Sequence, residues 1–156
     1  MAVLMDGKLV SEKTRDNIKS EVERLKNEFN KTPGLAVIVV GDDPASAVYV
    51  RNKHKACLAV GMNSYQIALP ATISQDELIS KIEELNADPL VDGILVQLPL
   101  PKHIDEKKVI NSIIPEKDVD AFHPVNVGKI MIGDFDFLPC TPAGVMELIK
   151  ETGIEI

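Results

Sequence analysis

Apolar and polar residues follow two periods along this chain, one typical of amphipathic helices and one typical of buried strands. The segment 11–30 is predicted to form an amphipathic helix with Ser11 as its N-cap, because apolar residues recur in it at helical spacing. These apolar residues are Ile18, Val22, Leu25 and Phe29. Pro33-Gly34 is predicted to separate this helix from the element that follows.

Three short segments are predicted to be strands, at residues 35–40, 64–69 and 93–98. The first is rich in β-branched residues and does not alternate with polar ones. This is the pattern of a strand that is covered on both faces of its sheet.

Two helices are predicted between these strands from their capping residues. Asp43 is a suitable N-cap and Pro44 a suitable first helical residue for a helix that ends near Gly61. Ser74 and Glu77 have the spacing of a capping box at the start of the next helix. Strands that alternate with helices indicate an α/β fold, here a three-layer βαβ domain with a mostly parallel sheet.

The second half of the chain is less regular. A short helix is predicted at 105–113, and residues 115–138 are predicted to be mostly loop, with brief strands near 129–132. Thr141 is predicted to cap a helix that runs to about Lys150. Residues 154–156 resemble the beginning of a further strand, which suggests that the chain is part of something longer.

Composition restricts the class of protein. The chain has 156 residues, enough for one domain with a sizeable core, and a net charge of −7 that argues against nucleic acid as its partner. No run of apolar residues approaches the length of a membrane span. The two cysteines, Cys57 and Cys140, form no Cys-x-x-Cys pair, so the sequence indicates neither a disulfide nor a zinc site. We expect a soluble protein of the reducing cytoplasm.

Tyr49 and Lys53 are the first candidates for chemistry. They lie four residues apart on a predicted helix, so that a phenol and an amine share one face. The alternative is a solvated lysine beside a half-buried tyrosine. The same spacing occurs in short-chain dehydrogenases, but this chain lacks their glycine-rich nucleotide loop.

Gln97 interrupts an apolar strand and is followed by Pro99 and Pro101. A polar amide at the carboxyl end of a parallel strand lies where α/β folds bind ligands, and the prolines would form a rigid apolar wall. The alternative is a glutamine exposed where the strand frays.

Asp118 and Asp120 stand on either side of Val119 in the predicted loop. A metal site is not indicated, because the three histidines have no ligand spacing. One of the two carboxylates is suited to receive paired N–H donors from an amino-heterocycle, which is a strong and directional arrangement. A solvated acidic loop is the alternative.

Taken together, these motifs resemble one family, the bifunctional methylenetetrahydrofolate dehydrogenase/methenyltetrahydrofolate cyclohydrolases. The resemblance covers essentially the whole chain and rests on several ordered motifs. They are MDGK at residues 5–8, DDPAS at 42–46, YVRNK at 49–53, DGILVQLPLP at 92–101, PEKDVDAFHP at 115–124 and PCTP at 139–142.

The resemblance implies two reactions and a set of site residues. Methylenetetrahydrofolate is oxidised to the methenyl cation with NADP, or alternatively NAD, as hydride acceptor, and the cation is hydrolysed to 10-formyltetrahydrofolate. Catalytic roles are implied for Tyr49, Lys53, Gln97 and Asp120, with Lys53 central, Tyr49 also stacking on the folate and Asp120 holding the amino edge of the pterin. The implied substrate-binding residues further include Val50, Arg51, Asn52, Val96, Leu98 and Pro99, and Cys140 and Thr141 are implied to face the nicotinamide.

The resemblance also implies a division of the chain. Residues 1–140 are expected to form the folate-binding catalytic domain, and residues 141–156 a linking helix and the start of a Rossmann-type cofactor domain that this chain lacks. Members of the family are usually dimeric, so a homodimer is expected. The alternative function is a folate-binding or interaction domain without catalysis, although binding alone would not require Lys53.

Overall fold

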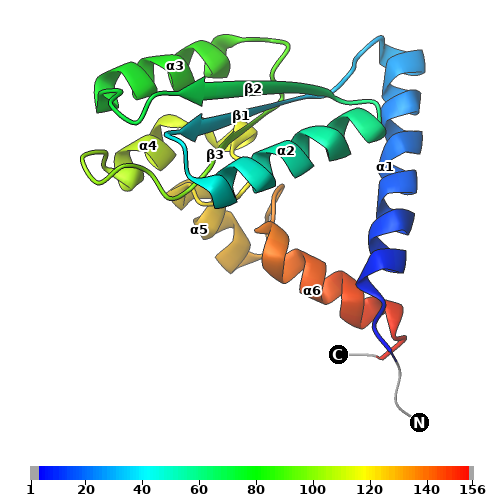
Figure 1. The fold of residues 1–156 in the computed structure, drawn as a ribbon. Coiled ribbons are helices and arrows are strands. Elements are labelled where there is room, and N and C mark those ends of the chain that lie inside the picture. The colour runs from blue at the N-terminus through cyan, green and yellow to red at the C-terminus, as the bar shows by residue number, and fades with distance from the viewer. Residues whose placement is uncertain (1–3, 155–156) are drawn as a thin grey trace.

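The computed structural model describes residues 4–154 and consists of a small parallel sheet with helices around it (Figure 1). In chain order its elements are α1 (Gly7–Phe29), β1 (Gly34–Val40), α2 (Pro44–Ala59), β2 (Asn63–Leu69), α3 (Gln75–Ala87), β3 (Gly93–Val96), α4 (Glu106–Ser112), the 3-10 helix η1 (Pro115–Lys117), α5 (Pro124–Ile132) and α6 (Cys140–Glu151).

The sheet has three strands in the order β2-β1-β3, and both pairings are parallel. Ala36 on the central strand pairs with Tyr65 on one side and Ile94 on the other. The α/β class and the parallel sheet predicted from the sequence are therefore confirmed.

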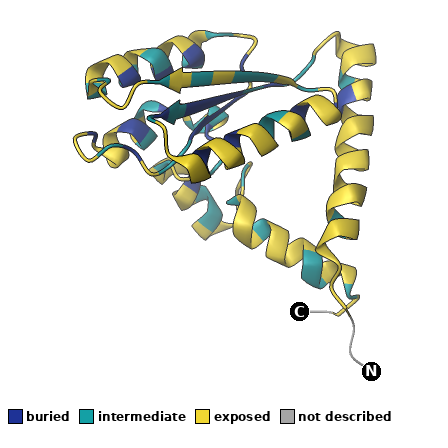
Figure 2. Cartoon of the chain, in the orientation of Figure 1, coloured by how far each residue is buried: buried dark blue, intermediate teal, exposed yellow. Residues whose placement is uncertain are grey.

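The core has two parts because successive side chains of a strand point to opposite faces of the sheet. Ala36, Ile38 and Val40 of β1 pack with α3 and α4, whereas Val37 packs with Val50 of α2. Figure 2 shows the buried residues gathered on the strands and on the helix sides that face them. The predicted three layers are thus α2, the sheet, and α3 with α4.

Two predicted helix starts are confirmed. The Asp43 side chain accepts a hydrogen bond from the Ser46 N–H at 2.7 Å, and Ser74 and Glu77 form both halves of a capping box. The first helix, however, begins at Gly7 and not near Ser11. Its cap is Asp6, whose carboxylate accepts from the N–H groups of the next turn, so that Ser11 lies inside the helix.

The third strand is shorter than predicted. It ends at Val96, and Gln97 contributes only a backbone N–H that donates to the Ile38 carbonyl at 2.8 Å. The chain then leaves the sheet, with a cis peptide bond between Leu98 and Pro99. Because proline has no N–H, neither Pro99 nor Pro101 can extend the ladder of hydrogen bonds.

The prediction of a loop with brief strands in 115–138 was wrong, because this segment contains η1 and α5. Pro124 occupies the first turn of α5, the His123 ring accepts a hydrogen bond from the Val125 N–H, and Gly133 ends the helix in the left-handed conformation. These are ordinary start and stop signals that the apolar run between them obscured.

The last helix also differs at its start. Thr141 was predicted to cap it, but α6 begins at Cys140, has Pro139 at the cap position and makes no side-chain cap hydrogen bond. Ile154 is not part of a strand, and the remainder of the further strand expected at 154–156 lies outside the described residues.

Helix α1 extends away from the sheet and meets α6 near its own beginning (Figure 1). An ion pair between Lys13 and Glu151, 3.0 Å from Nζ to Oε1, joins the two helices. Of the four apolar residues that predicted this helix, Val22 is buried whereas Ile18 and Phe29 are exposed. No helix among residues 4–154 is long and apolar enough to cross a membrane.

Candidate active site

Lys53 and Gln97 meet at the carboxyl end of the sheet. The Lys53 Nζ donates a hydrogen bond to Gln97 Oε1 at 3.0 Å, and Gln97 Nε2 donates to the Leu98 carbonyl at 2.8 Å. The Lys53 ammonium also lies 5.6 Å from the centre of the Tyr49 ring, within range of a cation–π contact. The structure therefore brings these three predicted residues together.

The topology of the sheet explains why Lys53 and Gln97 lie close together. The chain runs from β1 to β2 on one side and then crosses to β3 on the other, so the order in which strands are added to the sheet reverses between β1 and β3, although all three strands are parallel. Ligands of open α/β sheets bind outside the carboxyl ends of the strands at such a switch point. Val50 lies on the side of α2 that packs against the sheet. Tyr49 and Lys53 therefore lie on a more open side of this helix.

Asp120 lies on the loop that follows η1 and faces Lys53. Partial burial raises the pKa of its carboxyl and the negative charge of Asp118 adds to this, whereas the charge of Lys53 opposes it by lowering the pKa. Lys53 is thus near enough to act on Asp120 electrostatically. A cation, an uncharged amide and a carboxylate with a raised pKa share one partly buried site.

The loop that carries Asp120 is fitted closely to β3. Ile94 forms an isolated parallel bridge with Asp118, and a side chain at Gly93 would place its Cβ 2.5 Å from Val119 Cγ1. Glycine at this position therefore makes room for Val119. The close approach brings Asp120 to the end of the sheet where Gln97 lies.

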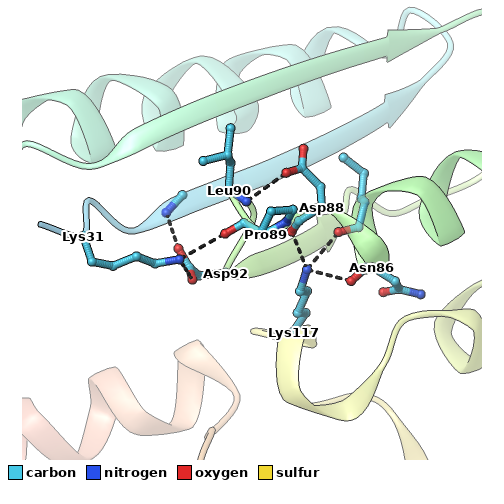
Figure 3. Close-up of polar contacts among 9 residues, drawn as sticks. Lys31, Asn86, Asp88, Pro89, Leu90, Asp92 and Lys117 are labelled. Atoms are coloured by element: carbon cyan, nitrogen blue, oxygen red, sulfur yellow. Dashed lines mark hydrogen bonds and ion pairs between the residues drawn. The ribbon is translucent and has the colours of Figure 1, made fainter. Parts of the chain in front are cut away.

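The start of this loop is tied to the end of α3. The Lys117 ammonium group donates to the carbonyl oxygens of Leu85, Asn86 and Asp88, at 3.0, 2.8 and 2.8 Å. Figure 3 shows Lys117 pointing toward Asn86 and Asp88. A cation at a helix C-terminus interacts favourably with the helix dipole and adds hydrogen bonds to the carbonyl groups at the helix end. Lys117 was not singled out from the sequence, because nothing local predicts which lysine reaches a distant helix end.

The apolar residues expected to line the site differ in exposure. Val96 is buried, Leu98 is half-buried and Pro99 is exposed. A small hollow is lined by Val96, Leu98, Asp120 and Phe122, among others, but not by Lys53 or Gln97. Phe122 was not predicted as a site residue. Its signal in the sequence was an aromatic residue two positions after Asp120, and the structure shows its side chain exposed.

The remaining predicted site residues are more dispersed. Val50 is buried in the core, whereas Arg51 and Asn52 are exposed on α2. Cys140 and Thr141 are exposed at the start of α6 and line a separate, mainly apolar hollow between α6 and α1.

Comparison with known proteins gives a consistent family. Residues 5–120 match the family described as tetrahydrofolate dehydrogenase/cyclohydrolase, catalytic domain. A curated relative, the bifunctional protein FolD of Acetivibrio thermocellus, is 63% identical over 155 residues, which are 99% of this chain and 54% of the relative. The chain thus spans about half the length of the curated relatives it matches.

Solved structures give the same picture. The bifunctional enzyme FolD, methylenetetrahydrofolate dehydrogenase/cyclohydrolase, of Campylobacter jejuni is 48% identical with a TM-score of 0.93, covering 97% of this chain and 54% of that one. The Trypanosoma brucei methylenetetrahydrofolate dehydrogenase-cyclohydrolase, complexed with NADP cofactor and inhibitor, is 39% identical with a TM-score of 0.94 over 99% of this chain and 53% of that one. The chain therefore belongs to the tetrahydrofolate dehydrogenase/cyclohydrolase family and carries the region matched by that family's catalytic domain.

Proposed function

We propose that this chain supplies the folate site and the catalytic lysine of a methylenetetrahydrofolate dehydrogenase/methenyltetrahydrofolate cyclohydrolase. The observation that carries the proposal is the contact of Lys53 with Gln97 at the carboxyl end of the sheet, with Tyr49 and Asp120 beside it. A site that only bound folate would have no need of an amine held in this way.

The hydrolytic step uses Lys53 as a general base. For this the Lys53 ammonium first gives up a proton, and the resulting amine then accepts a proton from water as the water oxygen bonds to the methenyl carbon. When the carbon–nitrogen bond of the ring then breaks, Lys53 returns this proton to the leaving nitrogen, while the hydroxyl proton of the intermediate passes to solvent and the formyl group forms. Gln97 orients the amine through its Oε1 without adding charge. Asp120 offsets positive charge at Lys53 and on the cationic substrate.

Folate recognition is assigned to the groups around this lysine. Tyr49 is 62% exposed, so its ring has a free surface on which a pterin can stack. Asp120 would accept paired N–H donors from the amino edge of the pterin, with the apolar walls formed by Val96, Leu98 and Pro99. Arg51 and Asn52 are exposed on the same helix as Tyr49, and Val50 would take part through its backbone only.

The dehydrogenase step also needs NADP, which accepts the hydride when bound. Cys140 and Thr141 fit a contact with its nicotinamide end, because α6 begins without a side-chain cap and both residues are exposed there. Most of the NADP site would lie on a second, Rossmann-type domain beyond the folate domain of residues 1–140, with residues 141–156 as the link. NADP in place of NAD is supported by the NADP bound in the Trypanosoma brucei relative.

The assembly and location that accompany this function are a homodimer in the cytoplasm. The location is supported by the acidic composition and by two cysteines that the structure leaves as free thiols. The alternative function, folate binding without catalysis, predicts a chain that binds folate but gives no turnover in any context.

Two measurements test the proposal. Calorimetric titration of the 156-residue chain with tetrahydrofolate should show one binding site. A chimera that joins this chain to the remaining part of the Acetivibrio thermocellus relative should reduce NADP with methylenetetrahydrofolate, whereas the chain alone should not, because hydride transfer requires a closely oriented cofactor. A chimera that binds tetrahydrofolate but produces no NADPH and hydrolyses no methenyltetrahydrofolate would favour the non-catalytic alternative.

A further inference from the structure

Asp118 and Asn126 are two of the three polar residues buried in the described part of the chain, with 2% and 3% of their surface exposed. Asp118 Oδ2 accepts hydrogen bonds from the His123 N–H at 2.8 Å and from Asn126 Nδ2 at 3.0 Å. Asn126 Nδ2 also donates to the Pro115 carbonyl at 2.9 Å. Groups with so little exposure offer a ligand almost no surface, so their main effect passes through the segment they hold.

That segment is the loop 115–123. Asn126, near the start of α5, is bonded to Pro115 at one end of the loop, and Asp118 is bonded to the backbone of His123 at the other. Asp120 lies between these two attachments. The hydrogen bonds therefore close the loop around the residue that faces Lys53.

The backbone beside Asp120 needs such a constraint. Ala121 has a φ of 55°, which places a buried alanine in the left-handed region. A non-glycine residue persists there only when its surroundings hold it, because its Cβ comes close to the following carbonyl oxygen in this conformation. The Ala121 N–H donates to the Asp118 carbonyl at 3.2 Å, so Asp118 holds this turn with its backbone as well as its side chain.

We propose that Asp118 and Asn126 are positioning residues that fix the Asp120 carboxylate opposite Lys53 and thereby set the affinity of the site for the pterin ring. This inference rests on the proposed function insofar as Asp120 is taken to hold the pterin. Its structural half, the fixing of Asp120 by the pair, stands independently of any ligand.

The test compares Asn126→Ala with a matched control, Asn86→Ala. Asn86 also makes two hydrogen bonds, from Nδ2 to the Ser112 carbonyl at 2.7 Å and from the Ile114 N–H to Oδ1 at 3.2 Å, but it ties α3 to the end of α4. Both variants should lower the urea midpoint of the chain. Only Asn126→Ala should speed hydrogen exchange at the amides of residues 119–121 beyond the change expected from its lower global stability. Equal exchange in the two variants would overturn the inference whether or not folate binds.

Binding tests the functional half. Calorimetric titration of the chain with tetrahydrofolate should give a dissociation constant about tenfold weaker for Asn126→Ala, the loss expected when a buried hydrogen-bonded group is removed. In an Asp120→Ala background the same substitution should cause no further weakening, because a residue that acts through Asp120 has nothing left to position. If the two substitutions instead weakened binding independently, so that their factors multiplied in the double variant, the inference would be overturned.

Should Asn126→Ala not fold, Asn126→Ser keeps a hydroxyl at this position and takes its place. Failure of the wild-type chain to bind tetrahydrofolate would instead refute the proposed function and leave the exchange result to decide the positioning role.

Discussion

Replacing Lys117 with methionine is expected to destabilise the chain markedly, although the residue only ends the short 3-10 helix η1. Its Nζ makes three hydrogen bonds to carbonyls at the C-terminus of α3, all at 3.0 Å or less. Methionine keeps most of the apolar stem and removes only the charged donor. The three bonds join the segment before Asp120 to the end of α3, which covers one face of the sheet.

The size of the effect follows from these contacts. A net contribution of about 0.5–1 kcal/mol per hydrogen bond, taken low because water can reach the freed carbonyls, gives about 1.5–3 kcal/mol. The favourable interaction of a cation with the helix dipole adds about 0.5 kcal/mol. Lys117→Met should therefore lower the free energy of unfolding by about 2–3.5 kcal/mol, a large part of the 5–15 kcal/mol typical of a domain.

Urea unfolding followed by circular dichroism measures this loss. With a slope of about 2 kcal/mol/M, the midpoint should fall by about 1 M or more at an unchanged slope. Lys108→Met is the matched control, since Lys108 is exposed on α4 and its substitution should change the free energy of unfolding by less than about 0.5 kcal/mol. Equal midpoints for the two variants would refute the role assigned to Lys117.

Three further predictions concern the site and the thiols. Gln97→Ala should lower turnover of the chimera about 10²-fold by misplacing the Lys53 amine, yet change the free energy of unfolding by less than about 1 kcal/mol; lost stability with normal turnover would show that Gln97 is structural. Asp120→Asn should gain stability relative to wild type as pH rises above the ordinary carboxyl pKa of 3.8, because a carboxyl whose pKa is raised in the folded state loses its stabilising contribution as pH rises through that pKa. A difference in urea midpoint, variant minus wild type, that falls as pH rises would contradict this. A thiol reagent at neutral pH should label exposed Cys140 quickly and Cys57 only on unfolding, because burial raises the pKa of the Cys57 thiol and blocks access; mass spectrometry of the labelled peptides decides it.

The sequence predicted those parts of the fold whose signals are local. The capping residues Asp43 and Ser74 and the unalternating first strand lie where expected, because a cap or a buried strand is recognisable within a few residues. The helix α5 was missed because its apolar run also suits a strand, and only the capping by His123 and the left-handed Gly133 settle the matter. The length of α1 was underestimated because a helix cap at Asp6 precedes the apolar repeat.

The site was predictable in its residue types but not in its supports. A resemblance and a strand-end position suffice to suggest Lys53, Tyr49 and Gln97. The structure joins Lys53 to Gln97 by a hydrogen bond and places Lys53 5.6 Å from the centre of the Tyr49 ring. Contacts over long stretches of chain have no such signal. The bonds of Lys117 to the end of α3 and the burial of Asp118 become visible only in three dimensions.

Hydrolysis of methenyltetrahydrofolate by the Lys53→Met variant of the chimera tests the central claim most directly. Methionine keeps the length of the side chain and removes the base, so the variant should fold and still bind tetrahydrofolate. Its rate, measured by loss of the methenyl absorbance across pH 6–9 and corrected for buffer catalysis, should fall by about 10²–10⁴-fold, as expected when a general base is lost. A variant that hydrolyses methenyltetrahydrofolate at the wild-type rate would remove Lys53 from the mechanism and leave its contacts with Tyr49 and Gln97 as structural ones.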